Sequence, residues 1–372
     1  MDNITHSLLG AALAKTRLGR AAPFAPAALV VAANLPDFEN FVLVFGGRTT
    51  NLVNHRGLTH GVLGIAVLIP LFTLLVYRLG KRLRPAKPST PAPRSRATFR
   101  NLLIGIGLAV ASHPALDWLN TYGVRPWLPF DATWYYGDVT FIVDPWLWLL
   151  LGAAVCLAGR RTRAGSLALG ALAALLTAIV LIYTHMAPLV LQIVWPAAIA
   201  ALALARWRNL GQTHPNAIVG AAFVLVAAYL GFLGGAGRTA WHMSEPVIAA
   251  RLAPGEVILA HTTSPQPANP LRWEIIAQTQ TAVYRHTFSI TRRPGGVVRL
   301  ARRLDDPLVR QAADSPQGRA WRAFARHPVA AVVKTARGHR VYLMDARYPL
   351  LPAPSFASFA IDVPAEPTAK TP

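Results

Sequence analysis

Long apolar runs dominate the first 235 residues of this chain. Seven of them approach the length of about 20 residues that an α-helix needs to cross a bilayer. They cover residues 23–45, 57–79, 101–119, 145–158, 166–185, 188–205 and 217–234. The fourth run is short, and Asn34-Leu-Pro-Asp37 interrupts the first. The sequence therefore predicts a mainly α fold, a polytopic α-helical membrane bundle of about seven spans.

The charge pattern predicts how these spans are oriented. Lys and Arg number 37 against 16 Asp and Glu. The basic residues cluster between apolar runs, at 15–20, 81–100, 160–163 and 206–208. Such clusters mark the cytoplasmic side of membrane helices, and alternating spans place all four there. A folded basic face would instead indicate nucleic acid, so we expect no nucleic-acid partner.

Beyond about residue 239 the sequence changes character. Charges of both signs return, and alternating polar and apolar residues at 272–290 and 330–345 predict hairpins. A helix is expected at 305–326. The predicted organisation is a membrane region at 1–150, further transmembrane helices at 151–238, a small C-terminal α+β soluble domain at 239–363, and a disordered tail at 364–372. The charge pattern puts the soluble domain on the outer face.

Acidic residues and histidines gather in the most apolar part of the chain. Seven acids precede Ser244, and all of them precede Pro145, in the same stretch as four histidines. A charged side chain at the centre of a membrane helix costs about 2.5–3.5 kcal/mol, so such residues persist where they have partners. Histidine with carboxylate is the usual ligand mixture for zinc, and also for manganese or iron. We therefore expect a site for one or two divalent ions within residues 1–150.

The spacing of these residues predicts that they converge. His113 and Asp117 lie four residues apart, so they share one helix face. Considered without the other candidates, these two residues could equally form a hydrogen bond at the end of the helix. His55 and His60 flank the start of the second apolar run, and Asp37 follows the break in the first. With the orientation above, all of these positions fall at the outer end of the spans.

Further residues could join this end of the bundle. His6 reaches the same depth if the first short helix is half-spanning. Asp138 and Asp144 precede the fourth apolar run on the same side. Arg56, beside His55, could hold a phosphate or carboxylate, or could mark the membrane interface.

Taken together, these motifs resemble a known family. They are the segments 1–10, 35–37, 55–60, 113–123 and 138–145. They resemble the bacterial membrane-bound metal-dependent hydrolase family, also described as the LexA-binding, inner-membrane-associated hydrolase family. The resemblance implies a multi-pass protein of the bacterial inner (cytoplasmic) membrane. It also implies a set of metal ligands or ligand supports, namely His6, Asp37, His55, His60, His113 and Asp117, with Asp138 and Asp144 following them.

The resulting prediction is an enzyme. A metal-activated water, most simply on zinc, would attack an ester or phosphoester of a small-molecule, lipid or envelope-derived substrate. Asp138 or Asp144 would take the proton, and Arg56 would steady an anionic substrate. Membrane lipids are the expected surroundings.

Two other classes of protein remain open. Intramembrane Asp and His also relay protons, as in a proton- or metal-coupled transporter. The basic linker 81–100 could bind acidic lipid or a protein partner, as in a membrane interaction or regulatory protein.

Overall fold

The computed structural model describes residues 1–22, 24–82, 95–182, 189–290, 295–350 and 355–364. The chain divides into two compact units. The first unit comprises Met1–Phe38, Arg56–Ala236 and Pro265–Pro270, and the second comprises Glu39–His55, Gly237–Ser264 and Leu271–Pro372. Most of the linker 81–100 and residues 365–372 of the expected tail lie outside the described residues.

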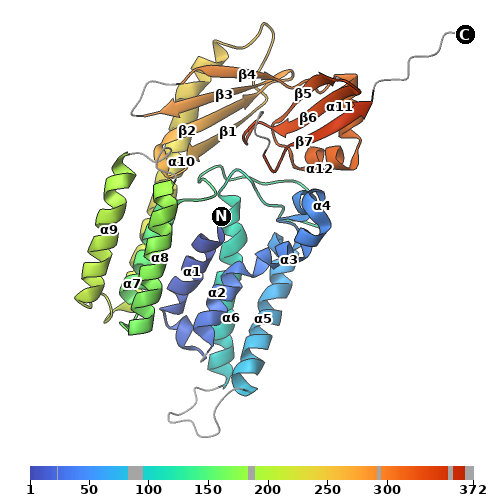
Figure 1. Ribbon diagram of the computed structural model, residues 1–372. Helices are drawn as coiled ribbons and strands as arrows, with labels where there is room; N and C mark the ends of the chain where they lie inside the picture. Colours follow the sequence, from blue (N-terminus) through green and yellow to red (C-terminus); the bar gives the residue numbers. More distant parts are fainter. Residues whose placement is uncertain (23, 83–94, 183–188, 291–294, 351–354, 365–372) are drawn as a thin grey trace, which may run out of the picture. The chain divides into compact units, whose positions relative to one another are not determined.

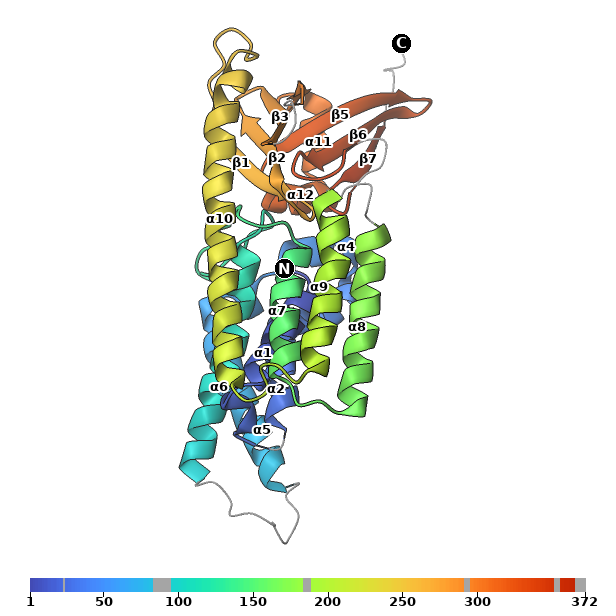
Figure 2. The same cartoon turned by 90° about the vertical axis from the view of Figure 1, so that its left-hand side faces the viewer.

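Helices build the first unit. They are α1 (Asn3–Ala14), α2 (Ala25–Asn34), α5 (Val62–Arg82), α6 (Ser95–Trp118), α7 (Pro145–Ala158), α8 (Arg163–Ile182), α9 (Leu189–Trp207) and most of α10 (Pro215–Ala249). Short 3₁₀ helices lie between some of them: η1 (Leu18–Arg20), η2 (Leu35–Phe38) and η4 (Leu58–His60). Figure 1 shows α1 and α2 packed beside α6, and Figure 2, turned by 90°, shows α7, α8 and α9 facing the viewer.

Among the described residues, five helices are long and apolar enough to cross a membrane: α5, α6, α8, α9 and α10. Only 11% of the most apolar window is buried in α5 and in α8, so these helices present apolar surface outward as lipid-facing helices do. The mainly helical membrane architecture is thereby confirmed.

The expected count of about seven spans is not confirmed. The run at 145–158 is an apolar helix of 14 residues, α7, shorter than a span. The run at 23–45 divides into α2, η2, α3 (Glu39–Leu43) and η3 (Val44–Gly46). Pro36 lies inside η2, and a proline donates no backbone hydrogen bond to a continuing helix.

Small residues set the packing of α1, α2 and α6. Ala32 and Ala33 of α2 and Ala109 of α6 are fully buried in one apolar cluster. At Gly10 of α1, an added Cβ would lie 2.6 Å from the carbonyl oxygen of Leu29 in α2. Close backbone approach through small residues is the usual way in which membrane helices pack. It fixes the end of α2, and with it the start of the segment that carries Asp37.

The second unit contains the strands. One antiparallel sheet has the order β1-β2-β3-β4, from β1 (Ala260–Gln266), β2 (Asn269–Gln278), β3 (Ala282–Ser289) and β4 (Val297–Ala301). The other has the order β5-β6-β7, from β5 (Pro328–Thr335), β6 (Gly338–Asp345) and β7 (Phe359–Pro364). Helices α11 (Pro307–Ala313) and α12 (Pro316–Phe324) lie between β4 and β5 in the chain. The C-terminal β region expected from residue alternation is confirmed.

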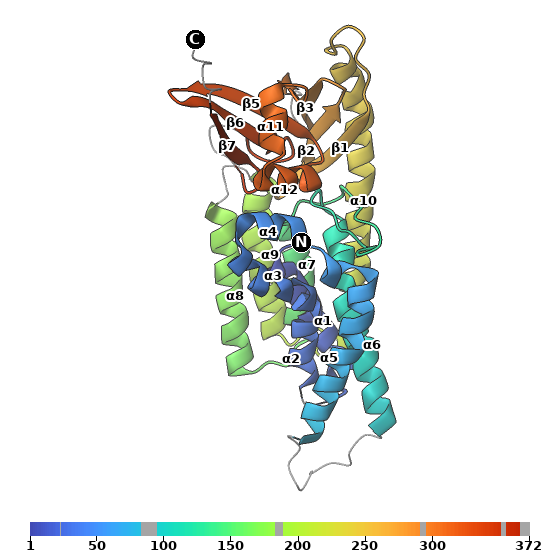
Figure 3. The ribbon, with the colours of Figure 1, turned by 90° about the vertical axis from the view of Figure 1, so that its right-hand side faces the viewer.

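A segment from early in the chain belongs to this second unit. Helix α4 (Gly47–Asn54) packs against α12 (Figure 3). The side chain of Arg48 donates hydrogen bonds to the carbonyl oxygens of Ser355 and Phe356. Two chain segments about 300 residues apart are therefore tied together in one unit.

Candidate metal centre

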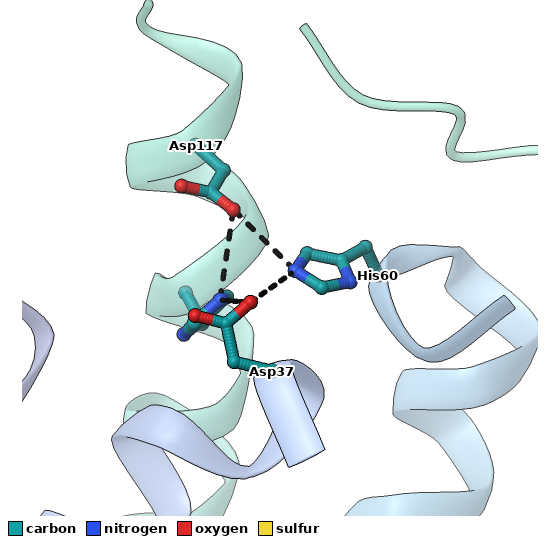
Figure 4. Close-up of side chains that lie close together, drawn as sticks. Asp37, His60 and Asp117 are labelled. Atoms are coloured by element: carbon teal, nitrogen blue, oxygen red, sulfur yellow. Dashed lines mark ion pairs between the residues drawn. The ribbon is translucent and has the colours of Figure 1, made fainter. Parts of the chain in front are cut away.

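Four side chains from three separate segments of the first unit point toward one another. Asp37 lies in η2, His60 ends η4, and His113 and Asp117 occupy successive turns of α6. Each offers one ligand atom, and these four atoms lie within 4.8 Å of one another. Figure 4 shows Asp37, His60 and Asp117 converging from three ribbons. We call these four residues the His/Asp cluster.

The distances within the His/Asp cluster suit a shared cation. The Nε2 atom of His60 lies 3.4 Å from Asp37 Oδ1 and 3.4 Å from Asp117 Oδ2. The Nε2 atom of His113 lies 3.5 Å and 3.6 Å from the same two oxygens. These separations exceed the range of about 2.7–3.2 Å for N–H···O hydrogen bonds. Ligand atoms around a tetrahedral ion at 2.0–2.2 Å lie about 3.3–3.6 Å apart.

Neighbouring groups hold each ligand in position. The Nδ1–H group of His113 donates to the carbonyl oxygen of Ala33 over 2.7 Å, which leaves the lone pair on Nε2 facing the cluster. The Nδ1 atom of His60 lies 3.2 Å from the hydroxyl of Thr59. Asp37 Oδ2 accepts a hydrogen bond from the Asn3 amide over 3.0 Å. In these three residues, the nitrogen or oxygen that faces away from the cluster is thus used for orientation.

Arg56 organises the other side of Asp117. One guanidinium nitrogen, Nη2, lies 2.9 Å from Asp117 Oδ1, and the α-amino group of Met1 pairs with the same oxygen. The other nitrogen, Nη1, donates to Asn120 Oδ1 over 3.0 Å and to the Gly123 carbonyl over 3.2 Å. Arg56 is only 4% exposed. The guanidinium of Arg56 is therefore occupied by contacts with protein atoms. Asp117 directs one carboxylate oxygen to the cluster and the other to Arg56.

Burial gives the site a direction of access. The side chains of His60, His113 and Asp117 are at most 1% exposed, whereas that of Asp37 is 13% exposed. Among the four members, Asp37 is therefore the one whose side chain reaches the surface of this unit.

His6 lies directly beside the cluster without being one of its four members. Its Nε2 atom is 3.5 Å from Asp117 Oδ1, and its ring stacks on that of His113 with centroids 3.7 Å apart. Within the described part of the chain, neither ring nitrogen of this buried histidine has a hydrogen-bond partner. A buried polar atom without a partner costs free energy. A ring nitrogen of His6 is therefore available to coordinate an ion beside the cluster.

The remaining sequence-predicted residues lie in other surroundings. His55 belongs to the second unit, where its Nδ1 atom is 3.3 Å from Glu39 Oε1. Asp144 is the N-cap of α7: Oδ1 accepts from the backbone N–H of Trp146, and Oδ2 accepts from the Tyr229 hydroxyl. Both of its oxygens are thus engaged in holding α7.

Asp138 is half-buried, with a left-handed backbone (φ 55°). Gly137 before it donates its backbone N–H to Trp118, and Val139 after it donates to Leu119. These bonds tie Asp138 to the end of α6, immediately after Asp117.

The sequence reasoning did not identify the amides that support the site. Asn3 contacts Asp37, and Asn120 contacts Arg56. Asn3 precedes His6 by three residues, which places both on one face of α1. That spacing is the one signal in the sequence that points to Asn3.

The fold and the cluster define a class: an integral membrane protein with a buried group of His and Asp side chains that could hold a metal ion. The sequence model of the YdjM inner membrane protein family matches residues 1–188, half of the chain. The chain belongs to this family of inner membrane proteins. All four members of the His/Asp cluster lie within the matched residues.

A curated protein that is similar to this chain is itself uncharacterized, so the similarity indicates no function. The uncharacterized protein YfhP of Bacillus subtilis (strain 168) is 26% identical over 168 residues, which are 42% of this chain and 46% of YfhP. The chain thus spans about half the length of this relative. No solved structure matches the chain.

Proposed function

We propose that this protein is a membrane-bound metal-dependent hydrolase whose ion is held by Asp37, His60, His113 and Asp117. The observation that carries the proposal is the spacing of the four donor atoms. Two imidazoles and two carboxylates, with four nitrogen–oxygen separations of 3.4–3.6 Å, favour zinc, because octahedral ions at 2.0–2.1 Å would bring neighbouring ligands to about 2.9 Å. Manganese or iron is the alternative for this donor set.

The surroundings of the cluster support a catalytic site over a purely structural one. A bound zinc would lower the pKa of a coordinated water to about 7 and so supply hydroxide at neutral pH. With all four side chains bound, the water would take a fifth position around the ion, as in catalytic zinc sites that expand to five ligands, and Asp37 is the ligand with an exposed edge. His6 offers a further donor beside the ion. Asp138, held beside the end of α6, is the proposed base that takes the proton of the water.

Two residues have different proposed roles from those first expected. Arg56 holds Asp117 and the loop after α6, so we assign it to positioning the ligand and not to holding substrate. Asp144 caps α7 and binds Tyr229, so we assign it a structural role.

The proposed substrate is an ester or phosphoester of a lipid or an envelope component. The cluster lies where α1 begins, whereas Lys15, Arg17 and Arg20 follow the end of that helix. If these basic residues are cytoplasmic, the cluster opens on the outer side of the membrane, and α10 leads the C-terminal domain outward.

The experiment is hydrolysis in ¹⁸O-labelled water by purified, zinc-loaded protein, with a bacterial lipid extract and chromogenic esters and phosphoesters as substrates. The expected result is chelator-sensitive product carrying one ¹⁸O atom, which His60→Ala abolishes and Asp144→Asn retains. Asp138→Asn should lower turnover by about 10²–10⁴-fold while the metal content is unchanged. Full metal occupancy without any hydrolysis, together with metal- or proton-driven uptake into proteoliposomes, would instead establish a transporter.

A further inference from the structure

A large cavity lies between α7, α8 and α9, in the first unit. Its volume is about 770 Å³, and its walls are mainly apolar. Trp148, Leu172, Leu176 and Trp195 are among the residues that line it. Pockets of about 300–1,000 Å³ hold ligands of drug size. Because α8 and α9 are both long and apolar enough to span the membrane, lipid chains would lie beside this cavity.

One end of the cavity is strongly basic. Arg206 and Arg161 both line it. Arg206 is only 8% exposed, and its guanidinium donates to the carbonyl oxygens of Cys156, Gly159 and Arg160 at the end of α7. These carbonyl oxygens carry no formal charge, and the Nε atom of Arg206 has no hydrogen-bond partner among the described residues. A buried guanidinium therefore meets the cavity without a counterion.

Two more observations extend this basic end. Arg161 is exposed and donates one hydrogen bond, to the carbonyl oxygen of Trp207. Lys15, at the end of α1, is so close that a Cβ added to Gly159 would lie 3.5 Å from its Nζ atom. No acidic residue occurs between positions 145 and 244, so these three helices supply no carboxylate. Two cations thus line one end of an apolar cavity, and a third, Lys15, lies close to Gly159 at the same end.

We propose that this cavity binds an anionic phospholipid. One acyl chain fills the space between α7, α8 and α9, and the phosphate lies against Arg161, Arg206 and Lys15. Basic pockets between membrane helices on the cytoplasmic side are suited to anionic headgroups. A free phosphate would leave the apolar walls unfilled, and a lipid without net charge would leave the guanidinium groups unneutralised.

The basic end of this lipid site lies away from the His/Asp cluster. His6 and Lys15 are nine residues apart on α1, which corresponds to about 14 Å along the helix axis. The proposed lipid binding therefore does not rest on the function proposed for the metal centre.

The test is native mass spectrometry of the full chain in detergent, titrated with phosphatidylglycerol, phosphatidylethanolamine or glycerol phosphate. Gly170→Trp fills the cavity, because nothing lies within 4 Å of a Cβ added at Gly170. Gly220→Trp is the matched control: a Cβ at Gly220 in α10 also meets nothing, and Gly220 is not among the residues lining the cavity. Arg161→Gln removes charge without touching the hydrogen bonds of Arg206.

Phosphatidylglycerol should bind about tenfold more tightly than phosphatidylethanolamine, since three cations face the headgroup. Gly170→Trp should lower that affinity about tenfold, and Gly220→Trp should leave it unchanged. Arg161→Gln should reduce the preference for phosphatidylglycerol about fivefold. Equal binding of the two lipids, or full binding by Gly170→Trp, would overturn the proposal. Tight binding of glycerol phosphate that Gly170→Trp leaves intact would also overturn it, by showing a site for phosphate alone.

Discussion

Gly10 connects helix packing to the metal centre, and replacing it with alanine tests that connection. The added Cβ would lie 2.6 Å from the Leu29 carbonyl oxygen and 2.8 Å from the Val30 Cα atom. Relaxed C···O contacts begin at about 3.3 Å, so α1 and α2 must separate locally by about 0.7 Å. Helix α2 also carries Ala33, whose carbonyl oxygen orients His113, and it leads directly into the segment of Asp37.

A shift of this size is large for a metal site, because ligand distances are defined to within about 0.2 Å. We expect Gly10→Ala to weaken metal binding by about 10–100-fold, the usual cost of disturbing groups that orient ligands. The assay is competition with a zinc chelator of known affinity, on protein purified in detergent.

The matched control is Gly220→Ala in α10, where a Cβ meets nothing within 4 Å. There the better helix propensity of alanine should stabilise the protein by up to about 1 kcal/mol. If Gly10→Ala bound metal as tightly as the wild type, the proposed coupling between α1–α2 packing and the cluster would be wrong.

Three further predictions concern other parts of the chain. In Arg56→Lys, the side chain keeps its charge but cannot contact Asp117 Oδ1, Asn120 and Gly123 at the same time. Calorimetric titration of the folded variant should therefore show about tenfold weaker metal binding. An unchanged metal affinity would show that Arg56 does not position the ligand. Tyr229→Phe deprives buried Asp144 of a donor and should cost about 1–3 kcal/mol in thermal unfolding; a loss of bound metal would contradict the structural role of Asp144. Burial lowers the pKa of His327 to about 3. Since the unfolded pKa is about 6.5, the contribution of neutral His327 is complete above pH 6.5 and falls by about 1.4 kcal/mol per pH unit as the pH drops toward 3. Hydrogen exchange in β5 and β6 should show this slope, and His327→Gln should flatten it.

The predictions from sequence succeeded where the pattern is local. Apolar runs predicted the helices that are long and apolar enough to span a membrane, and polar–apolar alternation predicted the two C-terminal hairpins. The span count could not be obtained this way. The hydropathy of residues 23–45 indicates one continuous apolar run. In the structure, Pro36 and the 3₁₀ turn around it divide that run into short helices.

The candidate metal centre likewise combines residues that local sequence patterns predict with contacts that only the tertiary structure reveals. His113 and Asp117 follow from one-turn spacing, and Asp37 and His60 follow from their positions at helix boundaries. Hydrogen bonds between distant segments could not be read from the sequence, such as those from Asn3 to Asp37 and from His113 to Ala33. For the same reason, the sequence marked Arg206 only as an orientation signal, and its buried position at the end of a cavity emerged from the packing of α7, α8 and α9.

Elemental analysis of the purified chain tests the central claim most directly. The proposal predicts one divalent ion per chain, retained through extensive dialysis, and lost in a variant that combines His60→Ala with His113→Ala. The matched control His286→Ala removes a buried histidine of the second unit, far along the chain from the cluster, and should keep the ion. Wild-type protein without a stoichiometric ion, or a double variant that keeps it, would contradict the assignment of the His/Asp cluster as a metal centre.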